Sequence, residues 1–186
     1  MGRRGRSNFG DKGHVFFLTT TVVKFGQVFA CGEEYYLILR DSLKHVLKEH
    51  RAALLAYVFM PSHVHLVIAM SQGESISALM RDFKKFTSTK IRQQLERDHN
   101  TYWLQRLRQN ALGVENQRFK LWMDRFDDLV ITSEHTLRVK MEYIHNNPVQ
   151  AGLVVVPEDW RFSSARNHVL GDQSFIDVRR DWSIPI

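Results

Sequence analysis

Two histidines stand one residue apart in the apolar run HVHLVIAM, residues 63–70. On a β-strand, side chains two positions apart point to the same face of the sheet, so His63 and His65 are expected to stand side by side. Val64, and Val58 across a predicted hairpin, are expected to face the opposite way. Two imidazoles at this spacing can both bind one divalent cation. Partly buried or surface histidines of no special function are the alternative.

A helix is predicted over residues 133–146, downstream of the histidines. Ser133 is suited to cap its N-terminus, and Glu134 is favourable in its first turn. Pro148 is expected to end it, because the residue before a proline is pushed out of the helical conformation. The core-facing stripe of this helix recurs at positions i, i+4 and i+7 and consists of Leu137, Met141 and Ile144.

Tyr143 and Asn147 lie one turn apart at the end of this helix. Tyr143 is about 100° round the helix from Ile144, on the flank of the stripe, where its hydroxyl can reach a face of the sheet. Asn147 would offer an amide oxygen to the same place, although Asn146 or His145 could serve instead. The alternatives are a half-buried tyrosine with its hydroxyl in water, and an Asn-Asn-Pro sequence that only stops the helix.

The elements that must position these residues alternate between strands and helices. In chain order they are a strand over residues 14–23, a helix over 33–50, strands over 53–60 and 63–70, a helix from about residue 75, a strand within 119–131, and the helix over 133–146. This order is close to the split βαβ arrangement. It predicts an α+β, ferredoxin-like fold, in which helices cover one face of an antiparallel sheet and the other face is free to carry a site.

The remaining segments are less regular. Residues 97–117 are polar and are expected to form a loop with a short helix, whereas residues 151–156 are expected to form a turn and a short strand. The sequence divides into a basic flexible arm over residues 1–13, one domain over residues 14–156, and a tail over residues 157–186.

Composition narrows the class of partner. The 186 residues include 26 Lys and Arg against 20 Asp and Glu, which gives a net charge of +6. This balance favours a polyanionic partner, with nucleic acid well ahead of an anionic membrane. Cys31 is the only cysteine, which excludes an internal disulfide and argues against a cysteine-based zinc site. The sequence has neither a signal peptide nor a membrane-spanning run, so a cytoplasmic protein is expected.

The residues then carry a resemblance to a known family. The chain resembles the single-tyrosine HUH transposases, where U is the hydrophobic residue between the histidines. The resemblance lies in the segment MPSHVHLVIAM followed by YIHNNPVQAGLV, with LWMDRFDDLVI before the tyrosine helix and DWRFSS after it. The chain is most similar to the REP-associated tyrosine transposases, relatives linked to repetitive extragenic palindromes in bacterial genomes. The likeness runs from about residue 14 to residue 164, and it implies a nucleoid-associated bacterial protein.

The resemblance implies a ferredoxin-like fold and the cleavage and joining of single-stranded DNA beside a hairpin through a 5′-phosphotyrosine intermediate. Tyr143 matches the nucleophile, His63 and His65 match the metal-binding pair, and Asn147 matches the third ligand of Mg²⁺ or Mn²⁺. The sequence departs from the family pattern at Met123 and Asp127, where relatives often carry glutamine and an aromatic residue. The polar segment over residues 97–117 is also longer than usual for the family. These departures are expected to affect DNA contacts and leave the nucleophile and the metal-binding residues unchanged.

DNA binding is expected to begin with electrostatic contacts. Six candidate phosphate contacts lie on the N-terminal arm and on the long helix, and they are Arg3, Arg4, Arg6, Arg81, Lys84 and Lys85. Such charges can equally form a solvated helix face. We expect the tail over residues 157–186 to pack on the domain or to contact DNA. Its Trp160 and Phe162 could stack on unpaired bases or pack the tail against the domain.

The expected partner is a DNA hairpin with a single-stranded flank, bound by a monomer or a homodimer without any membrane. Two other functions compete with a nuclease and strand transferase. The first is a DNA-hairpin-binding protein without cleavage activity, against which the intact set of His63, His65, Tyr143 and Asn147 argues. The second is a replication initiator or relaxase, which fits less well because those proteins usually order their motifs differently or carry more domains.

Overall fold

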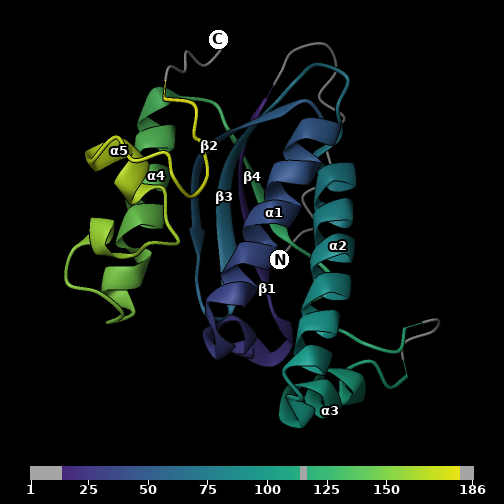
Figure 1. The fold of residues 1–186 in the computed structure, drawn as a ribbon. Coiled ribbons are helices and arrows are strands. Elements are labelled where there is room, and N and C mark those ends of the chain that lie inside the picture. The colour runs from purple at the N-terminus through teal and green to yellow at the C-terminus, as the bar shows by residue number, and fades with distance from the viewer. Residues whose placement is uncertain (1–13, 114–116, 181–186) are drawn as a thin grey trace, which may run out of the picture.

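Four strands form one antiparallel sheet in the computed structural model, which describes residues 14–113 and 117–180. The strands are β1 (Val15–Thr21), β2 (Ala52–Phe59), β3 (His63–Met70) and β4 (Asp127–Ile131). Their order across the sheet is β2-β3-β1-β4 (Figure 1). With a helix after β1 and another after β3, this is the split βαβ order. The predicted α+β class and antiparallel sheet are therefore confirmed.

The pairing register fixes which side chains share a face with the histidines. His65 on β3 lies opposite Thr19 on β1 and Val58 on β2, and His63 lies opposite Thr21. Directly opposed residues of an antiparallel pair point to the same face. Val58 therefore lies on the histidine face, and the prediction that it points away was wrong.

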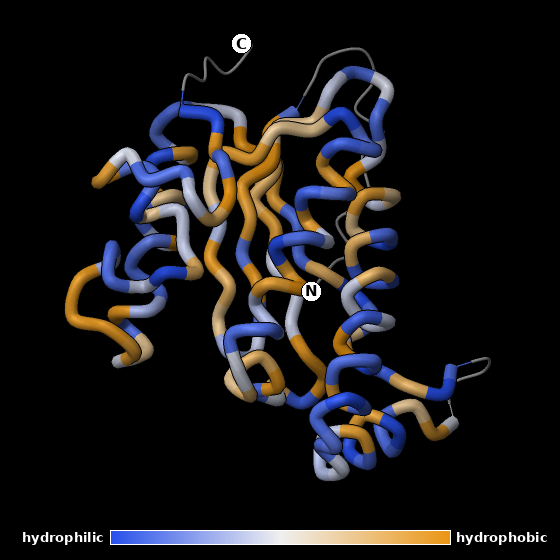
Figure 2. Tube along the Cα trace, viewed as in Figure 1, coloured by the Kyte–Doolittle hydropathy of each residue, from blue (hydrophilic) through white to orange (hydrophobic). Residues whose placement is uncertain are grey.

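Two helices cover the face opposite the histidines, as predicted. They are α1 (Glu33–Glu49) and α2 (Ile76–Arg97), and the side chain of Ser75 caps α2 by accepting a hydrogen bond from the backbone N–H of Ala78. The main core lies between these helices and the sheet, where large apolar side chains such as Leu39, Phe83 and Leu66 are fully buried. Figure 2 shows that apolar segments concentrate along the strands between the helices.

A further helix, α4 (Glu134–Gln150), packs on the histidine face, mainly against β2. Its buried stripe of Leu137, Met141 and Ile144 forms part of a second, smaller core cluster that also includes Val58. The predicted stripe is thus present, and its burial means that this face of the sheet is free only in part. Ser133 caps the helix by accepting a hydrogen bond from the backbone N–H of Thr136.

Helix α4 continues through Pro148 to Gln150, so the prediction that Pro148 ends it was wrong. A proline in the last turn removes one backbone N–H, and the backbone N–H of Ala151 still donates to the carbonyl of Asn147. The predicted strand over residues 151–156 is also absent, and Val155 in that segment is 86% exposed.

The outer edge of β2 is covered by the tail. The backbone N–H of Phe59 donates to the carbonyl of Phe162, and that of Arg179 donates to the carbonyl of Leu54. Within the tail, α5 spans Ala165–Val169. Phe162 stacks on Tyr36 with ring centroids 3.8 Å apart, so this aromatic side chain packs against the domain.

The predicted loop of residues 97–117 contains α3 (Thr101–Gln109), capped by Asn100, so the expected short helix is present. Three short 3-10 turns complete the regular structure of the described residues, at Val23–Phe25, Val28–Cys31 and Pro157–Asp159. Within the described ranges, no helix combines the length and the apolar character that crossing a membrane would require.

Candidate functional site

The predicted chemical residues meet where β1, β3 and α4 come together. The ring centroids of His63 and His65 are 4.8 Å apart, and those of His65 and Tyr143 are 5.2 Å apart. Both pairs are nearly perpendicular, with interplanar angles of 75° and 71°. Two imidazoles and one phenol from residues eighty positions apart in sequence therefore form one cluster within a single chain.

Phe17 on β1 holds this cluster together. Its ring stacks on His65 with centroids 5.6 Å apart and meets the ring of Tyr143 edge-on at 5.9 Å. Such aromatic contacts add stabilisation beyond the burial of apolar area. Phe17 therefore restricts the positions of both His65 and Tyr143.

Hydroxyl groups orient both imidazoles. Thr19 Oγ1 and His65 Nδ1 are 2.8 Å apart in a hydrogen bond, and Ser62 Oγ and His63 Nδ1 are 3.1 Å apart. A hydrogen bond at one ring nitrogen sets the ring orientation and favours one tautomer. If each Nδ1 donates its proton to the hydroxyl, the lone pair of Nε2 is left for a metal ion or another donor.

Burial keeps both imidazoles neutral. It lowers the pKa of His65 to about 3, with smaller contributions from His63 and from the charge of Lys140. Burial also lowers the pKa of His63, and a hydrogen bond with the side chain of Asn147 opposes that shift. Because a neutral imidazole has a free lone pair, both rings are in the state that binds metal ions at neutral pH.

The structure brings Asn147 to the histidines, and not its two neighbours. Asn147 is half-buried and its amide reaches His63. His145 instead forms a hydrogen bond of 2.9 Å from Nε2 to Ser164 Oγ, and Asn146 is exposed. Of the three candidates left open by the sequence, only Asn147 has a described contact with the imidazole pair.

The donors available for a metal ion are therefore two imidazole nitrogens and one amide oxygen. Within residues 14–113 and 117–180, no group of three or more His, Cys, Asp and Glu side chains could hold a metal ion. Any protein-bound cation at His63 and His65 would have to be completed by the amide of Asn147, by water or by substrate oxygens. A mixed set of this kind, with open positions, suits a cation that also binds phosphate.

Tyr143 is accessible from solvent. Its side chain is 41% exposed, because the residue lies on the flank of α4 and not in the buried stripe. A polymer such as a DNA strand can therefore reach the phenol without an opening of the core.

Lys140, one turn before Tyr143, was missed by the sequence interpretation. Its Nζ lies 4.7 Å from the ring centroid of Phe17 and 5.8 Å from that of Tyr143. The spacing of three residues from Tyr143 on a helix is the signal that could have found it, whereas the predicted phosphate contacts lie in groups of basic residues elsewhere in the sequence.

The predicted DNA-binding residues that the structure describes, Arg81, Lys84 and Lys85, do not join this cluster. Arg3, Arg4 and Arg6 lie outside the described residues. Arg81, Lys84 and Lys85 belong to α2 on the other face of the sheet. The Nζ of Lys84 donates hydrogen bonds to the carbonyls of Met123 and Asp124, at 2.6 and 3.1 Å. Lys84 therefore ties α2 to the following loop, while Lys85 is exposed.

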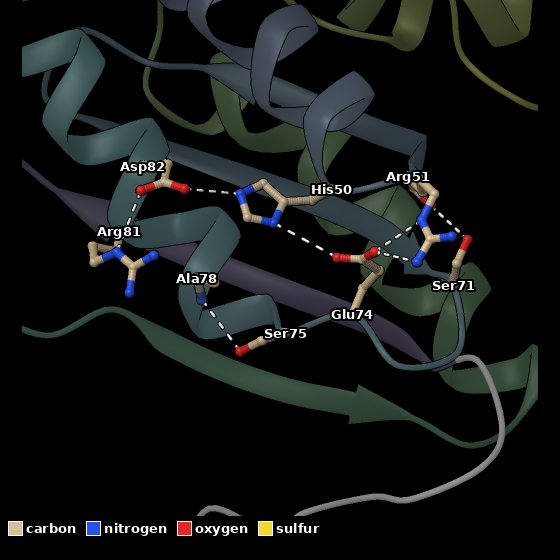
Figure 3. Close-up of polar contacts among 8 residues, drawn as sticks. All are labelled: His50, Arg51, Ser71, Glu74, Ser75, Ala78, Arg81 and Asp82. Atoms are coloured by element: carbon tan, nitrogen blue, oxygen red, sulfur yellow. Dashed lines mark hydrogen bonds and ion pairs between the residues drawn. The ribbon is translucent and has the colours of Figure 1, made fainter.

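Arg81 takes part in a polar network at the start of α2 (Figure 3). Its Nε donates to Asp82, and Asp82 also binds Nε2 of His50 at 3.0 Å, just beyond the end of α1. The side chain of Glu74 receives two hydrogen bonds from Arg51. These contacts connect α1, α2 and the β3–α2 loop, so this network supports the fold and lies apart from the histidine face.

Comparison with known proteins places the chain in a family. Residues 27–147, more than half of the chain, match the family described as Transposase IS200 like. A Haemophilus influenzae protein, whose name as a REP-associated tyrosine transposase is itself inferred, is 24% identical over 164 residues, which is 88% of this chain and 86% of that protein. The REP-associated tyrosine transposase of Escherichia coli K12 is 26% identical over 136 residues, which is 72% of this chain and 67% of that protein.

A solved structure shows the same fold. A REP-associated tyrosine transposase bound to a REP hairpin superimposes with a TM-score of 0.66 at 23% identity, covering 98% of this chain and 92% of that one. The predicted resemblance to REP-associated tyrosine transposases is confirmed, and with it the prediction of an enzyme. The chain therefore belongs to the family of IS200-like transposases.

Proposed function

We propose that the protein cleaves and rejoins single-stranded DNA beside a hairpin, through a metal-dependent reaction with a covalent 5′-phosphotyrosine intermediate. One observation carries the proposal: the ring of Tyr143 lies 5.2 Å from that of His65, which is 4.8 Å from that of His63. A nucleophile beside a pair of neutral imidazoles is the arrangement that this chemistry requires.

Tyr143 supplies the nucleophile. Its phenolic oxygen attacks the scissile phosphorus, a bond forms between them, and the bond from phosphorus to the 3′ oxygen breaks. The phenol gives up its proton, and the departing 3′ oxygen takes one up to become a free hydroxyl. Attack by another 3′ hydroxyl on the phosphotyrosine reverses these steps and joins DNA without ATP, because the energy of the phosphodiester bond is kept in the covalent intermediate.

His63, His65 and Asn147 would hold Mg²⁺ or Mn²⁺. When bound, the cation supplies positive charge to the nonbridging phosphate oxygens and stabilises the transition state. Thr19 and Ser62 orient the imidazoles through their Nδ1 atoms. Phe17 fixes the phenol next to His65, which limits the loss of entropy on reaching the reactive geometry.

The substrate follows from the charge of the chain and from its relatives. The net charge of +6 favours nucleic acid, and a solved relative with the same fold is bound to a REP hairpin. We infer a hairpin whose single-stranded flank passes over the α4 face, because Tyr143 is accessible there.

The test is incubation of the protein with labelled hairpin DNAs that carry single-stranded flanks, with Mg²⁺ or Mn²⁺, followed by denaturing electrophoresis. We expect a covalent protein–DNA band that is lost with EDTA and in Tyr143→Phe. Tyr102→Phe is the matched control, because Tyr102 on α3 is 60% exposed and outside the cluster, and it should retain the band. An undiminished band in Tyr143→Phe would refute the nucleophile, and tight binding without any band would favour a hairpin-binding protein.

A further inference from the structure

Lys140 places a positive charge against the proposed nucleophile. Its ammonium lies over the faces of two rings, at 4.7 Å from the centroid of Phe17 and 5.8 Å from that of Tyr143. The negative electrostatic potential of an aromatic face attracts a cation at such distances. Lys140 is half-buried on α4, so the two rings restrict where its ammonium can go.

Lys140 has no acidic partner among the residues that the structure describes. Two other lysines do have polar partners: Lys120 forms an ion pair with Asp124 at 2.7 Å, and Lys84 donates to two backbone carbonyls. Asp127 is opposite Thr19 in the register and so on the same face as His65, yet it forms no ion pair with Lys140. The charge of Lys140 is therefore uncompensated by the described part of the protein.

The ammonium lies next to the cluster that contains the imidazole pair. The ring of Tyr143, 5.8 Å from the ammonium, is 5.2 Å from the ring of His65. A positive charge in this position suits the binding of an anion next to the phenol.

We propose that the ammonium of Lys140 contacts a nonbridging oxygen of the scissile phosphate and acts as a catalytic residue. This proposal rests on the function proposed above, in which that phosphate lies at the hydroxyl of Tyr143. The contact draws the phosphate toward the phenol and stabilises the charge that the phosphoryl oxygens carry during attack. The rings of Phe17 and Tyr143 hold the ammonium in place before DNA arrives, so little conformational freedom is lost on binding.

A purely structural role is the competing explanation, because a cation on two aromatic rings also helps to dock α4 on β1. The two explanations differ in what they require. To dock α4, the ammonium needs to contact only the two rings. To act in catalysis, it must also contact the negative charge of one DNA phosphate.

The first experiment measures formation of the covalent adduct in single turnovers at saturating DNA. We expect Lys140→Met to slow the reaction about 100-fold, and Lys140→Arg, which keeps the charge, to recover at least tenfold of that loss. The matched control is Arg138→Met, which removes an exposed charge from the same helix and should change the rate less than twofold. Thermal melting of each variant tests the structural role, and we expect Lys140→Met to melt as the wild type does.

The second experiment uses DNA binding in the Tyr143→Phe background, where no cleavage can occur. Lys140→Met should weaken the binding of unmodified hairpin DNA about tenfold. It should not weaken the binding of a DNA that carries an uncharged methylphosphonate at the scissile position. Equal losses for both DNAs, or no loss for the unmodified DNA, would overturn the proposal. Because binding needs no cleavage, this experiment tests Lys140 even if the wild type forms no covalent adduct. The absence of an adduct in the wild type would contradict only the proposed function.

Discussion

The two faces of the sheet bury different kinds of side chain. On the face covered by α1 and α2, large apolar groups such as Leu39, Leu66 and Phe83 are sealed from solvent. On the face covered by α4, a smaller apolar cluster lies beside β2. Next to it are an imidazole pair, a phenol and an ammonium that solvent can partly reach.

This difference separates stability from chemistry. Burial of large apolar side chains supplies most of the favourable free energy of folding, and the larger cluster of such side chains lies on the α1–α2 face. The α4 face can therefore hold polar groups at little cost to the fold. Substitutions on the two faces should divide accordingly into those that change stability and those that change reactivity.

The largest effect is expected from His63→Ala on the α4 face. Loss of one of the proposed metal ligands should lower the rate of adduct formation at least 10³-fold, equivalent to about 4 kcal/mol of transition-state stabilisation. His63 is only partly buried, so the melting temperature should change by no more than a few degrees. Single-turnover kinetics measure the rate, and thermal melting measures the stability. A large fall in the melting temperature together with the loss of rate would contradict the separation of stability from chemistry.

The converse substitution is Phe83→Ala on the α1–α2 face. Phe83 is fully buried in the main core, and removal of such a ring costs about 3–5 kcal/mol of unfolding free energy. Denaturant unfolding measures that loss. Below the melting transition, adduct formation should stay within a few-fold of wild type, and a 10²-fold loss of rate in the folded variant would show that the faces are coupled.

A smaller effect is expected from Thr19→Val, which removes the hydroxyl bonded to His65 Nδ1. Partners that orient a ligating histidine typically contribute 10–100-fold to metal affinity, so Mn²⁺ binding, measured by titration calorimetry, should weaken by about that factor. Thr19→Ser keeps the hydroxyl and should restore affinity. Equal affinities of the valine and serine variants would exclude a role for this hydrogen bond.

Much of the fold could be predicted because its elements are periodic. The apolar run over residues 63–70 predicts a strand, and the stripe of Leu137, Met141 and Ile144 predicts the buried side of a helix; both are confirmed in the structure. Val58 was misplaced because a hairpin with two residues at its turn pairs an even-numbered residue with an odd-numbered one. Val58 therefore meets His65 directly, and the face of one strand cannot be transferred to the other by number alone.

The cluster itself could be predicted only in part. Tyr143 and Asn147 were placed near the histidines by helical spacing and by the resemblance, but the supporting contacts were not. Thr19 and Phe17 come from β1, more than forty residues before the histidines, and only the β1–β3 register brings them into contact. Lys140 was missed because its significance depends on the ring of Phe17 beneath it.

The most direct test is anomalous diffraction from crystals of Tyr143→Phe grown with Mn²⁺ and hairpin DNA. We expect one strong peak bound by Nε2 of His63, Nε2 of His65 and the amide oxygen of Asn147, with the ring of residue 143 beside it. A cation bound elsewhere, or imidazoles that contact no cation at saturating Mn²⁺, would contradict it.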